Sequence, residues 1–313
     1  MILFLVKANY KIGFGHLSRC SSIAQELRSF NEKKFIHGVE HKLKGIKYNC
    51  FTKIYSNKKN IFKIIKEKKI RKIIIDRHIS TNSIKKLKKT GCKLLQLNYS
   101  FEKSKYVDFV INYLIPNKRK NVFNNIKYLI IKKDIINKYS KLKTKNKNII
   151  LVGLGGSLNK KYLKKILDSI NHLKLKKFKV IFIFSKKINI KNGLINLENF
   201  EIIINPNNKE LKKLYKKSNI GVSSGGLQLT EMIANRINVL SIGKNRIEQK
   251  NINFFVKKGF CHTVRPNENI KIISNKLYNI INNITLRKKV EKNIVRSFSL
   301  SGSKNTANLI KRL

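Results

Sequence analysis

Residues that mark several common protein classes are scarce in this sequence. Tryptophan is absent, and the 313 residues include only 3 prolines and 4 cysteines. Cys20, Cys50, Cys92 and Cys261 are far apart and form no CxxC pair, so neither a disulfide framework nor a zinc site is predicted. We expect the four thiols to be small buried residues.

Long apolar runs are also missing. No run approaches the roughly 20 residues that a transmembrane helix needs. The apolar opening, residues 1–6, lacks a basic leader and a small-residue cleavage site, so it is read as a first strand and not as a signal peptide. We therefore expect a cytoplasmic protein without membrane insertion.

Acidic residues are few, with 16 Asp+Glu against 70 Lys+Arg and a net charge of +54. Such a balance normally raises nucleic acid as a partner. Here lysine is spread along the whole chain and accompanies abundant Asn and Ile. This pattern favours a genome-wide drift toward AT-rich codons over a dedicated nucleic-acid-binding surface. An aromatic-rich stacking motif is also lacking, so we expect no nucleic-acid partner. The charge still favours anionic ligands such as a nucleotide diphosphate.

Apolar runs alternate with amphipathic segments, which is typical of βαβ units and parallel sheets. The length favours two domains, and apolar periodicity stops in the polar stretch 138–148, where we place a linker. We expect an N-terminal α/β domain at 1–140 and a C-terminal one, with the terminal helices, at 148–313. The predicted strands are 2–6, 35–39, 72–76, 93–97, 109–112, 148–152, 179–184, 201–204, 219–223 and 238–242; the predicted helices are 16–30, 80–89, 162–170, 208–217, 226–235 and 248–257, with two or three more after them.

The first motif, Lys11-Ile-Gly-Phe-Gly-His-Leu-Ser-Arg19, follows the first strand and opens a helix. Gly13 and Gly15 allow a ligand to approach the backbone, and a helix N-terminus favours negative charge. His16 is our candidate catalytic general base, since imidazole exchanges protons near neutral pH. A tight turn with a solvated histidine is the alternative. The third glycine of a dinucleotide fingerprint is missing, which weakens a nicotinamide site.

Two further glycine turns follow strands in the second half. Gly155 and Gly156 belong to Gly153-Leu-Gly-Gly-Ser, whose amides could hold phosphate oxygens, although it has no Walker signature and could be only a strand–helix turn. In Val222-Ser-Ser-Gly-Gly-Leu-Gln-Leu-Thr-Glu, the predicted substrate-binding residues are Ser224, Gly225, Gly226 and Glu231.

The carboxylate of Glu231 could accept hydrogen bonds from ribose hydroxyls, and its alternative is a solvated acid favoured by the helix dipole. Gln249, near the next predicted helix start, could contact the sugar. Asp76-Arg-His78 ends another strand, so His78 is a second candidate acid or base, or merely a turn former.

Taken together, these motifs resemble a known family. IGFGHLSRCSSIAQEL is similar to the IGxGHxxRCxxLAxxL segment of the UDP-2,4-diacetamido-2,4,6-trideoxy-β-L-altropyranose hydrolases of pseudaminic acid biosynthesis, and of the related spore-coat polysaccharide proteins. The resemblance continues through IILVGLGGS and through SNIGVSSGGLQLTEMIANRINVLSIGKNRIEQ, a block shared with GT-B glycosyltransferases. It covers about residues 1 to 265.

The resemblance implies a GT-B-like fold, in which two Rossmann-like domains face a cleft, with no metal and no cofactor. It implies hydrolysis of a UDP-linked amino-deoxy sugar with release of UDP, in which His16 activates water, while Arg19 and the glycine loops contact the substrate. The sequence departs from the family at Leu97-Asn98, where a pair of aspartates is expected, and at Leu158-Asn159. A GT-B glycosyltransferase is the alternative, and no particular oligomeric state is predicted.

Overall fold

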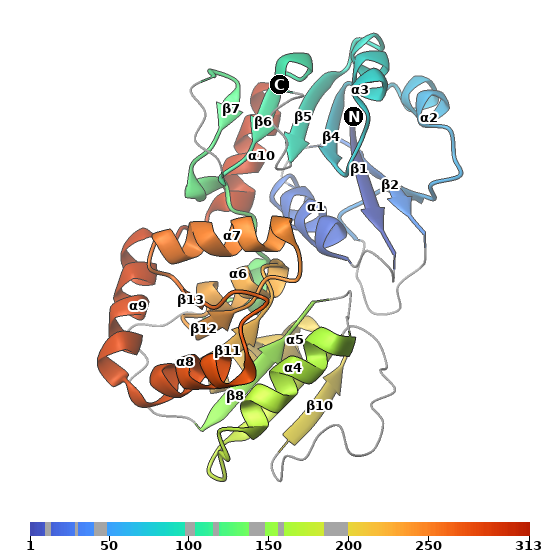
Figure 1. Ribbon diagram of the computed structural model, residues 1–313. Coiled ribbons are helices and arrows are strands. Elements are labelled where there is room, and N and C mark those ends of the chain that lie inside the picture. Colours follow the sequence, from blue (N-terminus) through green and yellow to red (C-terminus); the bar gives the residue numbers. More distant parts are fainter. Residues whose placement is uncertain are drawn as a thin grey trace. The chain divides into compact units, whose positions relative to one another are not determined.

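The computed structural model describes residues 1–9, 14–28, 31–40, 49–97, 104–114, 119–137, 148–155, 160–184 and 200–313. These residues form two compact units, Met1–Lys132 together with Ser299–Leu313, and Lys133–Phe298. Each unit is an α/β structure built on one parallel sheet, which confirms the predicted fold class (Figure 1). Within the described ranges, no helix has both the length and the apolar character that crossing a membrane requires.

The first unit has its strands in an order that reverses beside the first strand. Its elements are β1 (Ile2–Ala8), α1 (Gly15–Glu26), β2 (Lys34–Val39), β3 (Lys53–Tyr55), α2 (Ile61–Glu67), β4 (Lys72–Asp76), α3 (Thr81–Lys88), β5 (Lys93–Leu97), η1 (Ser104–Tyr106), β6 (Phe109–Ile111), β7 (Val122–Phe123), η2 (Ile126–Tyr128) and α10 (Gly302–Arg312). The sheet order is β3-β2-β1-β4-β5-β6-β7. The reversal between β1 and β4 is the place where open α/β sheets bind ligands.

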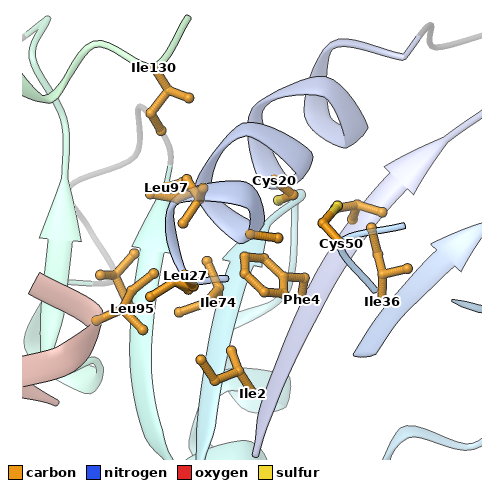
Figure 2. Close-up of a cluster of buried hydrophobic side chains, with 14 of the residues drawn as sticks. Ile2, Phe4, Cys20, Leu27, Ile36, Cys50, Ile74, Leu95, Leu97 and Ile130 are labelled. Atoms are coloured by element: carbon orange, nitrogen blue, oxygen red, sulfur yellow. The ribbon is translucent and has the colours of Figure 1, made fainter. Parts of the chain in front are cut away.

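Apolar side chains cover both faces of this sheet, as a parallel sheet requires. On one face, Phe4 and Ile74 pack with Cys20 of α1 and with Leu27, which caps its end (Figure 2). The alternate side chain Leu3 belongs to a second cluster, on the face covered by α2 and α3. Each large apolar side chain buried in this way contributes about 1.5–3 kcal/mol. Burial on both faces leaves the strand ends as the place for polar function.

The last helix, α10, differs from our expectation. We expected 148–313 to form the second domain, but Ser299–Leu313 belongs to the first unit. Leu309 and Ile310 of α10 are buried in the cluster that contains α1, and Nζ of Lys72 on β4 donates to the carbonyl of Ile310 at 2.9 Å. The apolar face of α10 completes the hydrophobic core of the first unit. These residues are far from the rest of that core in the sequence, so local patterns do not reveal the contact.

The boundary between the units lies at Lys132, earlier than the end at 140 that we expected. A 3-10 helix, η3 (Lys133–Ile135), opens the second unit. Shortly after it, the backbone N–H of Asn137 donates to Oδ1 of Asn235 at 2.9 Å. The polar stretch 138–148, our expected linker, lies outside the described residues except for its last position.

The second unit repeats the strand–helix alternation. Its elements are β8 (Ile149–Gly153), α4 (Lys160–Asn171), β9 (Lys179–Phe184), β10 (Phe200–Ile204), α5 (Asn208–Lys217), β11 (Ile220–Ser223), α6 (Leu227–Ala234), β12 (Asn238–Ser241), α7 (Arg246–Lys257), β13 (His262–Thr263), α8 (Ile270–Asn282) and α9 (Ile284–Ser297). The parallel order is β10-β9-β8-β11-β12-β13, so β8, β11 and β12 lie at its centre. Val152 and Val222 of these strands pack with Leu167 of α4 and Leu277 of α8.

Local patterning predicts β4, β5, β9 and α5 with the bounds that the structure shows. Three strands were not predicted, namely β3, β7 and β13, because two or three residues are too few for an alternation to register. The unpredicted helix α2 does carry a local signal. The side chain of Asn60 caps it by accepting from the backbone N–H groups of Phe62 and Lys63.

Candidate functional site

The first group of polar residues lies where β1 and β4 end. These strands are parallel neighbours, with Val6 paired to Asp76, so their carboxyl ends meet at one edge of the sheet. The chain after β1 enters α1 at Gly15, which places His16 in the first turn above that edge. A β carbon added at Gly15 would meet no atom within 4 Å, so there is open space beside this glycine. Gly13 lies outside the described residues.

Asp76 is the centre of this group, with a side chain that is 0% exposed. Its Oδ1 lies 2.9 Å from Nδ1 of His16. Arg19 donates from Nε to Oδ2 at 3.0 Å and from Nη2 to Oδ1 at 2.9 Å, a two-pronged contact that fixes the carboxylate plane. The imidazole of His16 is 32% exposed. The group therefore runs from a fully buried carboxylate to a ring that reaches solvent.

The charge on Asp76 decides which nitrogen of His16 can act as a base. Burial by itself raises the pKa of Asp76, but the charge of Arg19 and the hydrogen bond from His16 outweigh burial and hold this pKa below its ordinary value. The carboxylate is thus ionised at neutral pH and accepts a proton-bearing Nδ1. Nη2 of Arg19 also lies 2.9 Å from Nδ1 and has a second proton that an unprotonated Nδ1 could accept, so the contacts with Asp76 and Arg19 require opposite tautomers of the ring. With the proton on Nδ1, where it is donated to the ionised carboxylate, Nε2 carries the lone pair.

The sequence placed Asp76 at a strand end, where its side chain could reach a ligand, but left open whether Asp76 takes part. The signal available was a carboxylate at the end of a strand next to β1, but strand adjacency is not visible in a sequence. His78, our second candidate, is exposed and lies outside the group of His16, Arg19 and Asp76. The thiol of Cys20, 3.9 Å from Oδ2 of Asp76, is buried, and burial followed by the charge of Asp76 raises its pKa well above the ordinary value.

The second group lies at the ends of β8, β11 and β12. Ser223 is paired with Gly153 on one side and with Ser241 on the other, so three strand-end loops share one edge. Gly155 adopts a φ of +77°, the left-handed region that glycine enters without strain. Its N–H donates to Oε1 of Gln228 at 2.8 Å, so this amide has a protein partner. Gly156 lies outside the described residues.

The glycines before α6 have different physical reasons. A β carbon at Gly225 would come within 2.2 Å of the carbonyl oxygen of Glu248 in α7, so close approach of a neighbouring backbone requires a glycine there. At Gly226 the nearest atom would be Oγ of Ser224 at 3.8 Å, an ordinary contact. Gly226 is the N-cap of α6 and offers no side-chain cap. No side chain of Gly226 therefore competes for the first N–H groups of α6, which form the positive end of the helix dipole and attract anions.

Glu231 and Gln249 occupy different environments from each other. Glu231 is 4% exposed and accepts a hydrogen bond from the hydroxyl of Tyr215 at 2.8 Å. Burial and then the charge of Glu231 raise the pKa of Tyr215 well above its ordinary value, so the phenol stays protonated and donates. Gln249 is the fourth residue of α7, whose N-cap is Asn245, and its Nε2 donates to Asn253 at 2.9 Å. The proposed sugar contacts of Glu231 and Gln249 stay predictions.

Sequence reasoning missed Lys244, which follows β12 in this second group. Its Nζ donates to the carbonyl of Leu154 at 2.8 Å and lies 3.5 Å from Oε1 of Glu248. Among 70 Lys+Arg residues, a single functional lysine has no compositional signal. Its position three residues after a central strand of a parallel sheet was the available clue.

Metal-binding side chains do not gather in the part of the chain that the structure describes, where no set of three or more His, Cys, Asp or Glu residues could hold an ion. The four cysteines Cys20, Cys50, Cys92 and Cys261 are free thiols and are all buried, as predicted.

Similarity to proteins of known structure identifies the fold. No family model matches the sequence. The chain is 27% identical over 286 residues to the uncharacterized protein MJ1062 of Methanocaldococcus jannaschii, covering 82% of this chain and 58% of that protein's length. It thus spans well under two thirds of this relative.

Solved structures match nearly the whole chain. A glycosyltransferase of Rickettsia africae is 18% identical with a TM-score of 0.64, over 99% of this chain and 97% of the other. The S. aureus MnaA–UDP complex is 11% identical with a TM-score of 0.71, over 99% and 96%. A putative UDP-N-acetylglucosamine 2-epimerase of Listeria monocytogenes is 8% identical with a TM-score of 0.69, over 99% and 95%. At such identities these likenesses show the fold alone, and the chain has the two Rossmann-like units of the GT-B fold.

Proposed function

We propose that this protein is an enzyme that hydrolyses a UDP-linked amino-deoxy sugar and releases UDP. The observation that carries the proposal is the contact between His16 and the buried, ionised Asp76. It lies in the segment that resembles the hydrolases of pseudaminic acid biosynthesis. The matching structures include a protein solved with UDP and a putative UDP-N-acetylglucosamine 2-epimerase, which supports a nucleotide-sugar as the substrate class.

The chemistry assigned to His16 follows from its hydrogen bonds. Asp76 accepts the Nδ1 proton, so Nε2 accepts a proton from water while the water oxygen forms a bond to the anomeric carbon. The bond from that carbon to the phosphate oxygen breaks, and its electron pair leaves with UDP. The imidazolium that results is stabilised by the Asp76 carboxylate, which Arg19 keeps ionised and correctly oriented.

The nucleotide is assigned to the glycine loops of the second unit. Ser224, Gly225 and Gly226 lead into the N-terminus of α6, which has no side-chain cap, and there phosphate oxygens meet the first N–H groups and the positive end of the helix dipole. Glu231 is assigned to the ribose hydroxyls and Gln249 to the sugar. No metal is required by this scheme, because helix dipoles and lysines offset the diphosphate charge. We place the reaction in the cytoplasm, where four free thiols stay reduced.

A glycosyltransferase is the second candidate, favoured by the fold shared with a protein described as one. The same Nε2 of His16 can take the proton of a sugar hydroxyl as readily as that of water. Whether UDP release requires a sugar acceptor therefore distinguishes the two functions.

The deciding experiment incubates the purified protein with a panel of UDP-linked amino-deoxy sugars and no acceptor. We expect UDP release, loss of release in His16→Ala, and unchanged release in the matched control His78→Ala. In water enriched with heavy oxygen, the label should enter the sugar and not UDP, because the carbon–oxygen bond is the one that breaks. Release only after an acceptor is added would establish the transferase, and no release under either condition would refute both functions.

A further inference from the structure

Lys244 lies between β12 and α7, at the edge of the second sheet where the three loops meet. Its side chain is only 10% exposed. A β carbon added to Gly155 would lie 3.6 Å from Nζ of Lys244 and 3.7 Å from Oγ of Ser224. The ammonium group is therefore held directly beside the glycine turn after β8, on the same edge as the N-terminus of α6.

We propose that Lys244 binds the pyrophosphate of the nucleotide and makes the site selective for a nucleoside diphosphate over a nucleoside. The inference rests on the proposed function, since it presumes that a UDP-sugar binds in the second unit. Nζ donates to the neutral carbonyl of Leu154. A phosphate oxygen carries the negative charge that the carbonyl lacks, so the ammonium gains Coulomb attraction when it exchanges one acceptor for the other.

A purely structural role would make Lys244 a tie between the β8 loop and the start of α7. The contacts of Glu248 argue that the tie does not need the ammonium. Oε2 of Glu248 already accepts the backbone N–H of Lys244 at 2.9 Å, and Asn245 caps α7 by accepting from the N–H groups of Ile247 and Glu248. The start of α7 is thus anchored by groups other than Nζ, so Nζ can turn to a ligand without releasing the helix.

Glu248 sets the affinity of this arrangement. Its Oε1 lies 3.5 Å from Nζ, so the carboxylate pairs with the lysine before the nucleotide arrives and competes with an incoming phosphate. Glu248→Gln keeps an oxygen that can accept the backbone N–H of Lys244 but removes the competing charge. We expect UDP to bind this variant several-fold more tightly, with uridine binding unchanged.

The test measures binding of UDP, UMP and uridine by calorimetry to the wild type and three variants. Lys244→Met should weaken UDP binding by about 10- to 100-fold, the usual effect of losing a charge-assisted contact, and change uridine binding by less than about twofold. Lys250→Met removes the same charge from an exposed position of α7 and should change neither. This control matters in a chain of net charge +54, where any lost lysine reduces attraction for anions.

The outcomes separate this inference from the proposed function. If the wild type binds neither UDP nor uridine, the proposed function is wrong. If it binds UDP and Lys244→Met keeps the wild-type ratio of UDP to uridine affinity, or loses both ligands equally, Lys244 is structural and the inference is wrong. If Lys244→Met fails to fold in a thermal melt, Glu248→Gln decides: tighter UDP binding with unchanged uridine binding supports the inference, and unchanged UDP binding overturns it.

Discussion

Replacing Asp76 by asparagine tests the proposed mechanism without removing the base itself. An asparagine amide can donate to Nδ1 of His16, which moves the ring proton to Nε2 and takes away the lone pair that accepts the water proton. From general-base contributions of about 10²–10⁴ in rate, we expect kcat for UDP release to fall by about that factor. KM should change little, because Asp76 is fully buried behind His16.

The same change has a cost in stability that follows from Arg19. Its guanidinium is 20% exposed and would lose the carboxylate that engages it through two hydrogen bonds. Breaking a buried ion pair by removing one partner costs about 3–5 kcal/mol, and the exposure of Arg19 moves the expectation to the lower end of that range. Denaturant unfolding of Asp76→Asn measures this loss, and assays should be run well below its melting temperature.

Asp108→Asn is the matched control for Asp76→Asn. Asp108 accepts from Lys88 at 2.7 Å and from the backbone N–H of Leu94 at 2.8 Å in the same unit. Burial opposes the shift, but these contacts hold the pKa of Asp108 below its ordinary value, so its loss also removes a stabilising carboxylate. We expect Asp108→Asn to lower stability and leave kcat unchanged. A kcat for Asp76→Asn within threefold of the wild type would refute the assigned role of the carboxylate.

Three further predictions concern the second unit. Burial lowers the pKa of His262 to about 4, so below the ordinary value near 6.5 the unfolded chain takes up a proton that the folded chain does not. After discounting for the partial exposure of His262, we expect the free energy of unfolding to fall by roughly 1–2 kcal/mol between pH 6.5 and 4. In melts at different pH values, His262→Asn should reduce this loss. Gly225→Ala places a β carbon 2.2 Å from a backbone oxygen of α7, so it should lower the free energy of unfolding by about 1–3 kcal/mol and weaken UDP binding. The adjacent Gly226→Ala, whose nearest atom is 3.8 Å away, should lower it by less than about 1 kcal/mol. Equal losses of stability in denaturant unfolding would contradict this packing argument. Tyr215→Phe leaves the buried carboxylate of Glu231 without this donor and should cost about 1–3 kcal/mol, and an unchanged unfolding midpoint would show that the bond carries no stability.

The sequence by itself determined the architecture. Parallel strands buried on both faces must be continuous apolar runs, and such runs, separated by amphipathic helices, are a local property of the chain. The bounds of β4, β5, β9 and α5 could be predicted for this reason. The glycines after β8 and β11 were also visible, because glycines between an apolar run and an amphipathic segment are typical of strand–helix turns. His16 was identified through its place between such a turn and a helix.

Only the tertiary structure decided the partners of these residues. His16 and Asp76 are 60 residues apart, and they meet because the sheet order places β4 directly beside β1. Lys244 reaches the carbonyl of Leu154 across 90 residues through the adjacency of β8, β11 and β12. The last helix joined the first unit because its apolar face matched a cluster formed about 300 residues earlier in the chain, around Phe4.

The physical reason for this division lies in the range of the interactions. Hydrophobic periodicity and turn chemistry depend on residues that are near neighbours in the sequence. They therefore specify individual helices and strands but not the order of the strands in the sheet. Strand order, by contrast, is settled by the burial of complete faces, and it alone sets which strand ends share an edge. For that reason the sequence left the part played by Asp76 open, and the arrangement of β1 and β4 side by side makes it the partner of His16.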